Sequence, residues 1–174
     1  YLDQGLKSND KNIVLQLIKV KALDNLAKLD LAEDVFKRLI NYYPDVSAFN
    51  YTLTQFYLKH GRKDEAENEF RRVIKNKPND LGAKIKLIQL LRVTKDIEAA
   101  KVQLVEFVNQ SPDNYDLKFA LVQFYISQKQ IALAHQKIAE IIAGSNDADT
   151  EIKAKGIKAG LFLTQNDKSM AEKV

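Results

Sequence analysis

Few residues of this 174-residue chain carry side chains that could do catalytic chemistry. The chain has no cysteine, which excludes thiol nucleophiles and disulfides. One of its two histidines, His60, precedes Gly61 near an expected helix end, and the other, His135, has no acidic or nucleophilic partner at helical spacing. Neither the HExxH motif nor a GxxxxGKS/T phosphate-binding motif occurs. We therefore expect no enzyme activity and no cofactor, and we interpret His60 as a turn residue.

An alternating acidic run, Asp147, Asp149 and Glu151, resembles the start of a calcium-binding loop. Such a loop needs glycine at its sixth position and a bidentate glutamate at its twelfth. Ile152 and Lys158 stand there instead. We therefore expect no metal site, and we expect Asp149 or Thr150 to cap the helix that follows.

The composition is that of a folded chain with charges spread over its surface. Hydrophobic residues make up 45% and charged residues 29%, and 27 basic against 23 acidic residues give a net charge of +4. No apolar run approaches the roughly 20 residues of a membrane span. The absence of cysteine does not distinguish an exported from a cytosolic protein. Because the sequence begins at Tyr1 and ends at Val174 inside an expected helix, we expect a piece of a longer protein.

A 34-residue period positions every candidate functional residue. The chain has only three prolines, Pro44, Pro78 and Pro112, spaced by 34 residues. Alanines recur at the same interval between them, at Ala32, Ala66, Ala100 and Ala134. Apolar residues follow the helical spacing almost throughout, so the period predicts stacked two-helix repeats in an all-α chain.

The period defines the expected boundaries of the repeats. They are 1–11 (the remnant of a preceding repeat), 13–46, 47–80, 81–114, 115–148 and 152–174 (a partial fifth repeat). Asn12, Asp80 and Asn114 precede three of the first helices, where their side chains can accept from free amides of the first turn. Gly61 is expected to end a helix in the left-handed conformation.

One break in the period is expected after Ile142. The fourth proline is missing, Asn146 stands in its place, and the polar segment AGSNDADTE lengthens the loop. We expect the first helix of the fifth repeat to run from Ile152 to about Leu163 and its second helix to begin at Lys168. The lengthened loop is also where a bend in the stack is expected.

The second repeat most fully resembles the tetratricopeptide repeat (TPR) family. The matching residues are Leu53, Tyr57, Gly61, Ala66, Phe70 and Pro78. The large aromatic residue that the family places early in its first helix is replaced here by Gln16, Asn50, Lys84 and Lys118. The resemblance covers essentially the whole chain and implies a right-handed α-solenoid whose first helices line a concave face.

The resemblance also implies where a ligand would lie. One outward position of the first helices carries Leu17, Tyr51, Ile85 and Phe119, and the position one turn later carries Lys21, Gln55, Gln89 and Gln123. Lys59 and Arg92 add positive charge nearby. The aromatics would anchor a peptide or else pack between helices; the glutamines would bind peptide backbone or else keep an open face soluble.

These residues predict a protein–protein interaction scaffold that binds a peptide or protein segment on its concave face. The alternative is a spacer or self-association module without a groove ligand. Repeats that read RNA need polar base-reading pairs and a basic track along the phosphates, so the apolar position argues against nucleic acid. TPR proteins are frequent in bacterial envelope assembly, which favours the periplasm over the cytoplasm.

Overall fold

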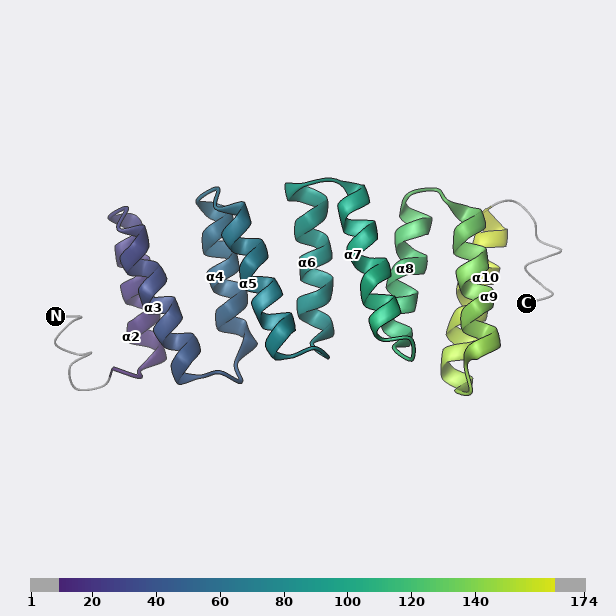
Figure 1. The fold of residues 1–174 in the computed structure, drawn as a ribbon, viewed down its shortest axis with the longest axis horizontal. Helices are drawn as coiled ribbons and strands as arrows, with labels where there is room; N and C mark the ends of the chain where they lie inside the picture. The colour runs from purple at the N-terminus through teal and green to yellow at the C-terminus, as the bar shows by residue number, and fades with distance from the viewer. Residues whose placement is uncertain (1–9, 165–174) are drawn as a thin grey trace. The chain divides into compact units, whose positions relative to one another are not determined.

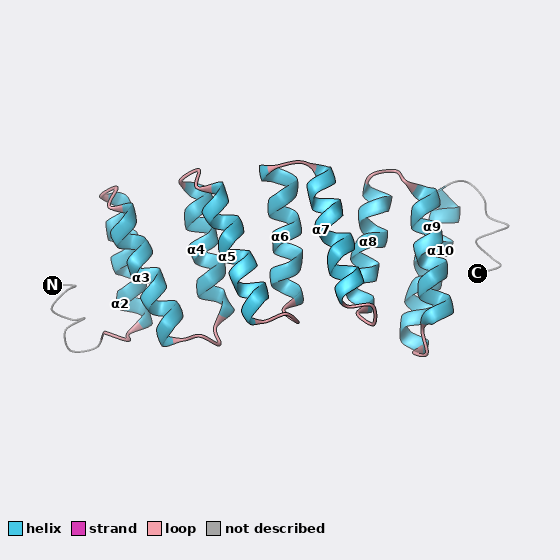
Figure 2. Ribbon diagram, in the orientation of Figure 1, coloured by secondary structure: helices cyan, strands magenta, loops and turns pink. Residues whose placement is uncertain are grey.

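A computed structural model describes residues 10–164, and all regular secondary structure in this range is α-helical (Figures 1 and 2). The helices follow one another as antiparallel pairs joined by short turns, which confirms the predicted α-solenoid of helix pairs. The chain divides into two compact units, Tyr1–Leu90 and Leu91–Val174. The boundary between the units falls inside one helix, α6 (Leu81–Thr94).

Between residues 10 and 90, the first unit contains four complete helices and the beginning of α6. They are α2 (Ile13–Asn25), α3 (Leu29–Tyr42), α4 (Ser47–Lys59) and α5 (Lys63–Asn76). α2 packs against α3, α3 against α4, and α4 against α5.

The part of the second unit that the structure describes, residues 91–164, contains the end of α6 and four further helices. They are α7 (Ile97–Gln110), α8 (Tyr115–Ser127), α9 (Ile131–Gly144) and α10 (Ala148–Thr164). Within this unit α8 packs against both α7 and α9, and α9 packs against α10.

The alanine ladder lies at the most tightly packed positions of the second helix of each repeat. Ala32, Ala66, Ala100 and Ala134 all have 0% exposure. A helix surface with only a methyl group lets a neighbouring backbone approach closely, while larger residues on either side fill the space around it. In α5, Phe70 and Val73 are the larger partners of Ala66.

Side-chain caps begin three of the first helices at the predicted residues. The carboxamides of Asn12 and Asn114 accept from backbone amides at 3.0 Å, and Asp80 accepts from the amide of Ala83 at 2.8 Å. These contacts satisfy amides that have no partner inside the helix.

The turn between the two helices of a repeat takes a left-handed residue in three cases. Gly61 has φ +71°, as predicted, and Ala27 and Lys129 take φ 54° and 57° at the equivalent positions. The third repeat differs, because Asp96 is extended and its carboxylate caps α7 by accepting from the amide of Ala99 at 2.7 Å.

The last described helix begins earlier than the sequence predicts. α10 starts at Ala148, whereas the first helix of the fifth repeat was expected from Ile152. The prediction that Asp149 or Thr150 caps it is also wrong, because Asp147 accepts from the backbone amide of Thr150 at 2.9 Å and from its hydroxyl at 2.7 Å. Those two hydrogen bonds hold the pKa of Asp147 below its usual value.

Two expectations fall mostly on residues outside the described range. The preceding-repeat remnant at 1–11 is described only at residues 10 and 11, where Asp10 accepts from the hydroxyl of Tyr42 at 2.7 Å. The second helix expected from Lys168 lies wholly outside it. Among the described residues, no helix combines the length and apolar character needed to cross a membrane.

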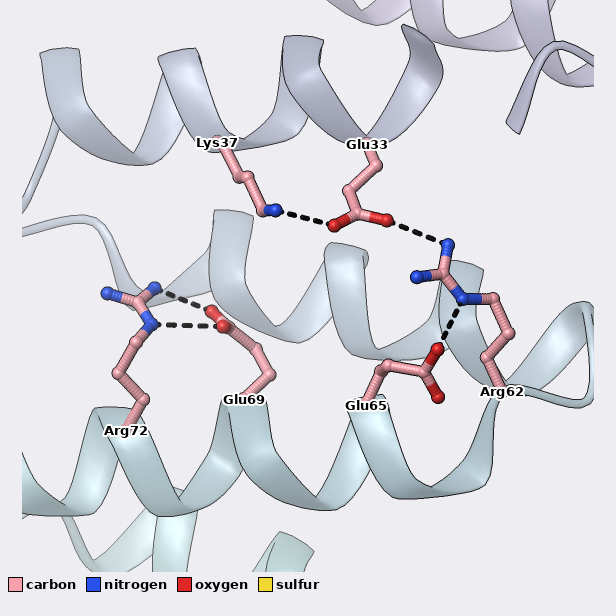
Figure 3. A network of polar contacts seen from close by, with 6 residues as sticks. All are labelled: Glu33, Lys37, Arg62, Glu65, Glu69 and Arg72. Atoms are coloured by element: carbon pink, nitrogen blue, oxygen red, sulfur yellow. Dashed lines mark hydrogen bonds and ion pairs between the residues drawn. The ribbon is translucent and has the colours of Figure 1, made fainter. Parts of the chain in front are cut away.

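A network of ion pairs ties α3 to α5 in the first unit (Figure 3). The carboxylate of Glu33 lies 2.6 Å from Lys37 and 2.7 Å from Arg62, and Arg62 also contacts Glu65 at 2.8 Å. The guanidinium carbon of Arg62 lies 4.7 Å from the ring centroid of Tyr57. Burial, and after it a hydrogen bond to Glu33, strongly raises the pKa of Tyr57.

The cap of α10 can be tested by comparing two neighbouring aspartates. Asp147→Ala removes the acceptor for the Thr150 amide, so we expect that amide to exchange with solvent about fivefold faster. Asp149→Ala is the control and should leave the rate unchanged, because Asp149 lies inside the exposed first turn. Hydrogen exchange measured by NMR checks both, and equal acceleration in the two variants would contradict the assignment.

Candidate functional site

The ten residues predicted from the repeat pattern are divided between the two units. The first unit holds Leu17, Lys21, Tyr51, Gln55, Lys59, Ile85 and Gln89, and the second holds Arg92, Phe119 and Gln123. Their side chains fall into two groups, one packed into the protein and one open to solvent.

Tyr51, on α4, packs against α5 and the beginning of α6. Its ring centroid lies 5.9 Å from that of Phe70, and its hydroxyl donates to Asp80 at 3.1 Å. The ammonium of Lys86 lies 5.2 Å from the ring centroid, close enough for a cation–π contact. Burial, followed by the charge and hydrogen bond of Asp80, raises the pKa of Tyr51 to about 12. Gly82 makes this approach possible, because a Cβ there would lie 3.2 Å from the Tyr51 hydroxyl.

Phe119 is the counterpart of Tyr51 in the second unit. It is 6% exposed, and the ammonium of Lys153 from α10 lies 4.3 Å from its ring centroid. A cavity of about 450 Å³ opens beside this ring between α8 and α10. Asp116, Asp149 and Thr150 are among the residues that line it. Each of the two aromatics therefore contacts a lysine of its own unit, a feature that the repeat pattern did not predict.

The remaining apolar positions are partly open. Leu17 of α2 is 37% exposed and Ile85 of α6 is half-buried. Both belong to the first unit, where each stands one turn before a polar exposed residue, Lys21 or Gln89.

The three glutamines of the ladder are exposed. Gln55, Gln89 and Gln123 make no side-chain hydrogen bond to any residue between 10 and 164. Other exposed glutamines do bond: Gln110 donates to Glu106 at 3.0 Å and Gln136 donates to Glu140 at 3.1 Å. The ladder glutamines have no acidic residue four positions away, so their amides stay available.

Lys59 is engaged in a contact between two repeats. Its ammonium lies 2.6 Å from one oxygen of Asp24, and Nε2 of His60 lies 2.7 Å from the other. The hydrogen bond from Lys59, and then that from His60, keep the pKa of Asp24 below its usual value despite partial burial. His60 directly follows α4, as the interpretation of it as a turn residue predicts. Its contact with Asp24 also links the end of α4 to α2. Arg92 is exposed.

His135 lies in a hydrophobic setting on α9. Its ring centroid lies 4.6 Å from that of Phe162, and both ring nitrogens are buried without a hydrogen-bond partner among the described residues. Between residues 10 and 164, no cluster of three histidine or acidic side chains could hold a metal ion.

Part of the chain matches a known family model. Residues 27–87 match the family model described as a tetratricopeptide repeat. A crystal structure of a tetratricopeptide repeat protein from Parabacteroides merdae is similar to this chain, with a TM-score of 0.52 at 15% identity. The similarity covers 98% of this chain and 65% of that protein, so the chain spans about two thirds of its length.

Two further solved structures have the same fold. A crystal structure of MamA has a TM-score of 0.52 at 15% identity and covers 88% of each chain. A structure of Naa15/Naa10 bound to HypK-THB has a TM-score of 0.51 at 16% identity and covers 98% of this chain and 26% of that one. No curated protein matches the sequence.

Residues 27–87 therefore resemble the tetratricopeptide repeat family in sequence, and the chain shares its fold with a solved tetratricopeptide repeat protein. Proteins with this fold typically serve as non-catalytic scaffolds for protein–protein interaction. The feature of this chain that bears on such a role is the exposed carboxamide of each ladder glutamine, which lies one turn after an apolar residue.

The contact between Asp24 and Lys59 generates a pH-dependent prediction. Asp24→Asn removes a charge that stabilises the folded state, but the Lys59 side chain is 62% exposed, so we expect a loss of about 1 kcal/mol or less at pH 7. A carboxyl whose folded pKa is depressed stabilises the protein above its unfolded pKa and loses that effect as pH falls through the folded pKa. The difference from wild type should therefore shrink as the pH falls from 7 to 2.

Urea unfolding followed by circular dichroism at pH 7 and pH 2 measures this difference. Asp34→Asn, an exposed carboxylate on α3, is the control and should change stability little at either pH. A stability loss for Asp24→Asn that is as large at pH 2 as at pH 7 would show that the ion pair is not its cause.

Proposed function

We propose that this protein is a scaffold that binds an extended segment of a partner protein at the exposed positions of the first helices of its repeats. One observation carries the proposal. Gln55, Gln89 and Gln123 recur at 34-residue spacing with exposed amides that bond to no described residue. A carboxamide presents both donors and an acceptor, so it can pair with peptide backbone whatever the peptide's sequence.

The residue one turn before each glutamine supports this use. Tyr51 and Ile85 are half-buried and supply apolar surface one turn before Gln55 and Gln89, whereas Phe119, one turn before Gln123, is 6% exposed and lines a cavity. A partner's apolar side chain packed there would be partly desolvated, and the neighbouring amide would hold its backbone in register. The cavity beside Phe119 gives the second unit room for a bulky side chain.

Position-specific photocrosslinking of the full-length protein in its native host tests the proposal. A photoreactive phenylalanine derivative is placed singly at residues 55, 89 and 123. The matched controls are residues 68, 102 and 136, which are exposed on the second helices and recur at the same 34-residue spacing. We expect adducts with the same partner from at least two of the first three positions and none from the controls.

The outcomes separate the two candidate functions. Adducts of equal yield from both sets of positions, or no adducts at all, would contradict a binding face on the first helices. Adducts between two copies of this chain would instead support the self-association module.

A further inference from the structure

The charges of the first unit are divided unequally between its two sets of helices. The first helices, which are α2, α4 and the part of α6 that belongs to this unit, carry five basic residues and one acidic residue. The second helices, α3 and α5, carry six basic and seven acidic residues. A partner that lies along the first helices therefore meets a surface with an excess of positive charge.

The second helices balance their own charges. Ion pairs with glutamates hold Lys37, Arg71 and Arg72 (Figure 3 shows the first and the last of these). Exposed carboxylates on the same two helices, among them Asp34 and Asp64, offset the remaining cations. The excess charge of the unit is therefore confined to the first helices.

The first helices have no spare carboxylate to neutralise that excess. Their one acidic residue, Asp24, is engaged by Lys59 at 2.6 Å and by His60 at 2.7 Å. Lys21 of α2 and Lys86 of α6 are exposed, and neither makes an ion pair with any residue between 10 and 164.

Lys86 is held in place without being neutralised. Its ammonium lies 5.2 Å from the ring centroid of Tyr51. The face of an aromatic ring attracts a cation but carries no net charge, so the ammonium can still donate hydrogen bonds to an anion. The contact with Tyr51 restrains the long lysine side chain before a ligand arrives.

Asp80, which also contacts Tyr51, makes no ion pair with Lys86. Its carboxylate accepts from the hydroxyl of Tyr51 at 3.1 Å, from the amide of Ala83 at 2.8 Å and from the hydroxyl of Ser47 at 3.3 Å. The oxygens of Asp80 are therefore committed to the start of α6, and Lys86 stays available to a carboxylate of another molecule.

The two lysines flank the glutamine ladder of this unit. Lys21 stands one period before Gln55, at the same position of its helix, and Lys86 stands about one turn before Gln89 on α6. A segment whose backbone pairs with both glutamines would therefore meet one lysine on α2 and another on α6.

We propose that the partner segment is acidic, and that its aspartate or glutamate side chains bind Lys21 and Lys86 on either side of Gln55. This inference rests on the proposed binding face of the first helices and adds the chemistry of the segment that the face selects. Each contact would be a charge-assisted hydrogen bond between an ammonium and a carboxylate.

The second unit does not share this preference. Lys153 lies over the ring of Phe119 as Lys86 lies over Tyr51, with 4.3 Å between ammonium and ring centroid. It also lies 3.9 Å from the carboxylate of Asp116, and Asp149 lines the same cavity. The selection for carboxylates is therefore a property of the first unit.

Two peptides test the proposal. Both are acetylated and amidated; one alternates valine with glutamate, and the other alternates valine with glutamine. NMR titration of the full-length protein, followed at the side-chain amides of Gln55 and Gln89, should show about fivefold tighter binding of the glutamate peptide, as expected for two exposed charge pairs. The preference should fall as salt is raised from about 20 mM to about 500 mM, because salt screens exposed charges.

A matched pair of double variants separates the site from the net charge. Lys21→Gln combined with Lys86→Gln should abolish the preference for the glutamate peptide. Lys63→Gln combined with Lys75→Gln removes the same charge from exposed positions of α5 and should retain the preference. All four side chains are exposed, so circular dichroism should stay unchanged in both variants.

Three results would overturn the proposal. They are the absence of saturable binding by either peptide, equal affinity of the wild type for both peptides, and equal loss of the preference in the two double variants. Equal affinity with saturable shifts at Gln55 and Gln89 would leave the binding face of the first helices standing. Failure of that face itself would appear in the crosslinking experiment, so the two failures are distinguishable.

Discussion

Close packing at one small side chain per repeat is the constraint on which the structure depends. Ala32, Ala66, Ala100 and Ala134 are all fully buried, and each lies on the second helix of its repeat among bulky apolar neighbours. A single helix pair leaves one apolar face uncovered, so each pair is stable only when the next pair packs on it. The alanines allow that packing, and the 34-residue period then sets where every outward residue points.

Much of this architecture follows from the sequence because it depends on local rules that repeat. Asn12, Asp80 and Asn114 cap helices where their spacing predicts, and Gly61 takes the left-handed turn. The predicted start of α10 was wrong by four residues. The loop after Ile142 breaks the 34-residue period, and several acidic residues in it could cap a helix. Only the geometry selects Asp147.

The candidate sites were less predictable, because they depend on contacts between helices far apart in the sequence. The pattern places Tyr51 and Phe119 outward but does not reveal that Lys86 and Lys153 lie over their rings. The cavity beside Phe119 is lined by residues of α8 and α10, which no sequence pattern brings together. The exposure of the glutamines, by contrast, follows directly from helical periodicity. The sequence therefore predicts which site residues recur on an exposed helix face. It does not predict the contacts that these residues make with other helices.

The packing claim is tested most directly by enlarging one alanine of the ladder and one exposed alanine on the same helix. Ala134→Leu forces three carbons into a fully buried position of α9 and should lower the free energy of unfolding by about 1–3 kcal/mol. Ala139→Leu, on the exposed side of α9, should change it by less than about 0.5 kcal/mol. Urea unfolding followed by circular dichroism measures both. Equal stability of the two variants would contradict the dependence of the fold on its small buried residues.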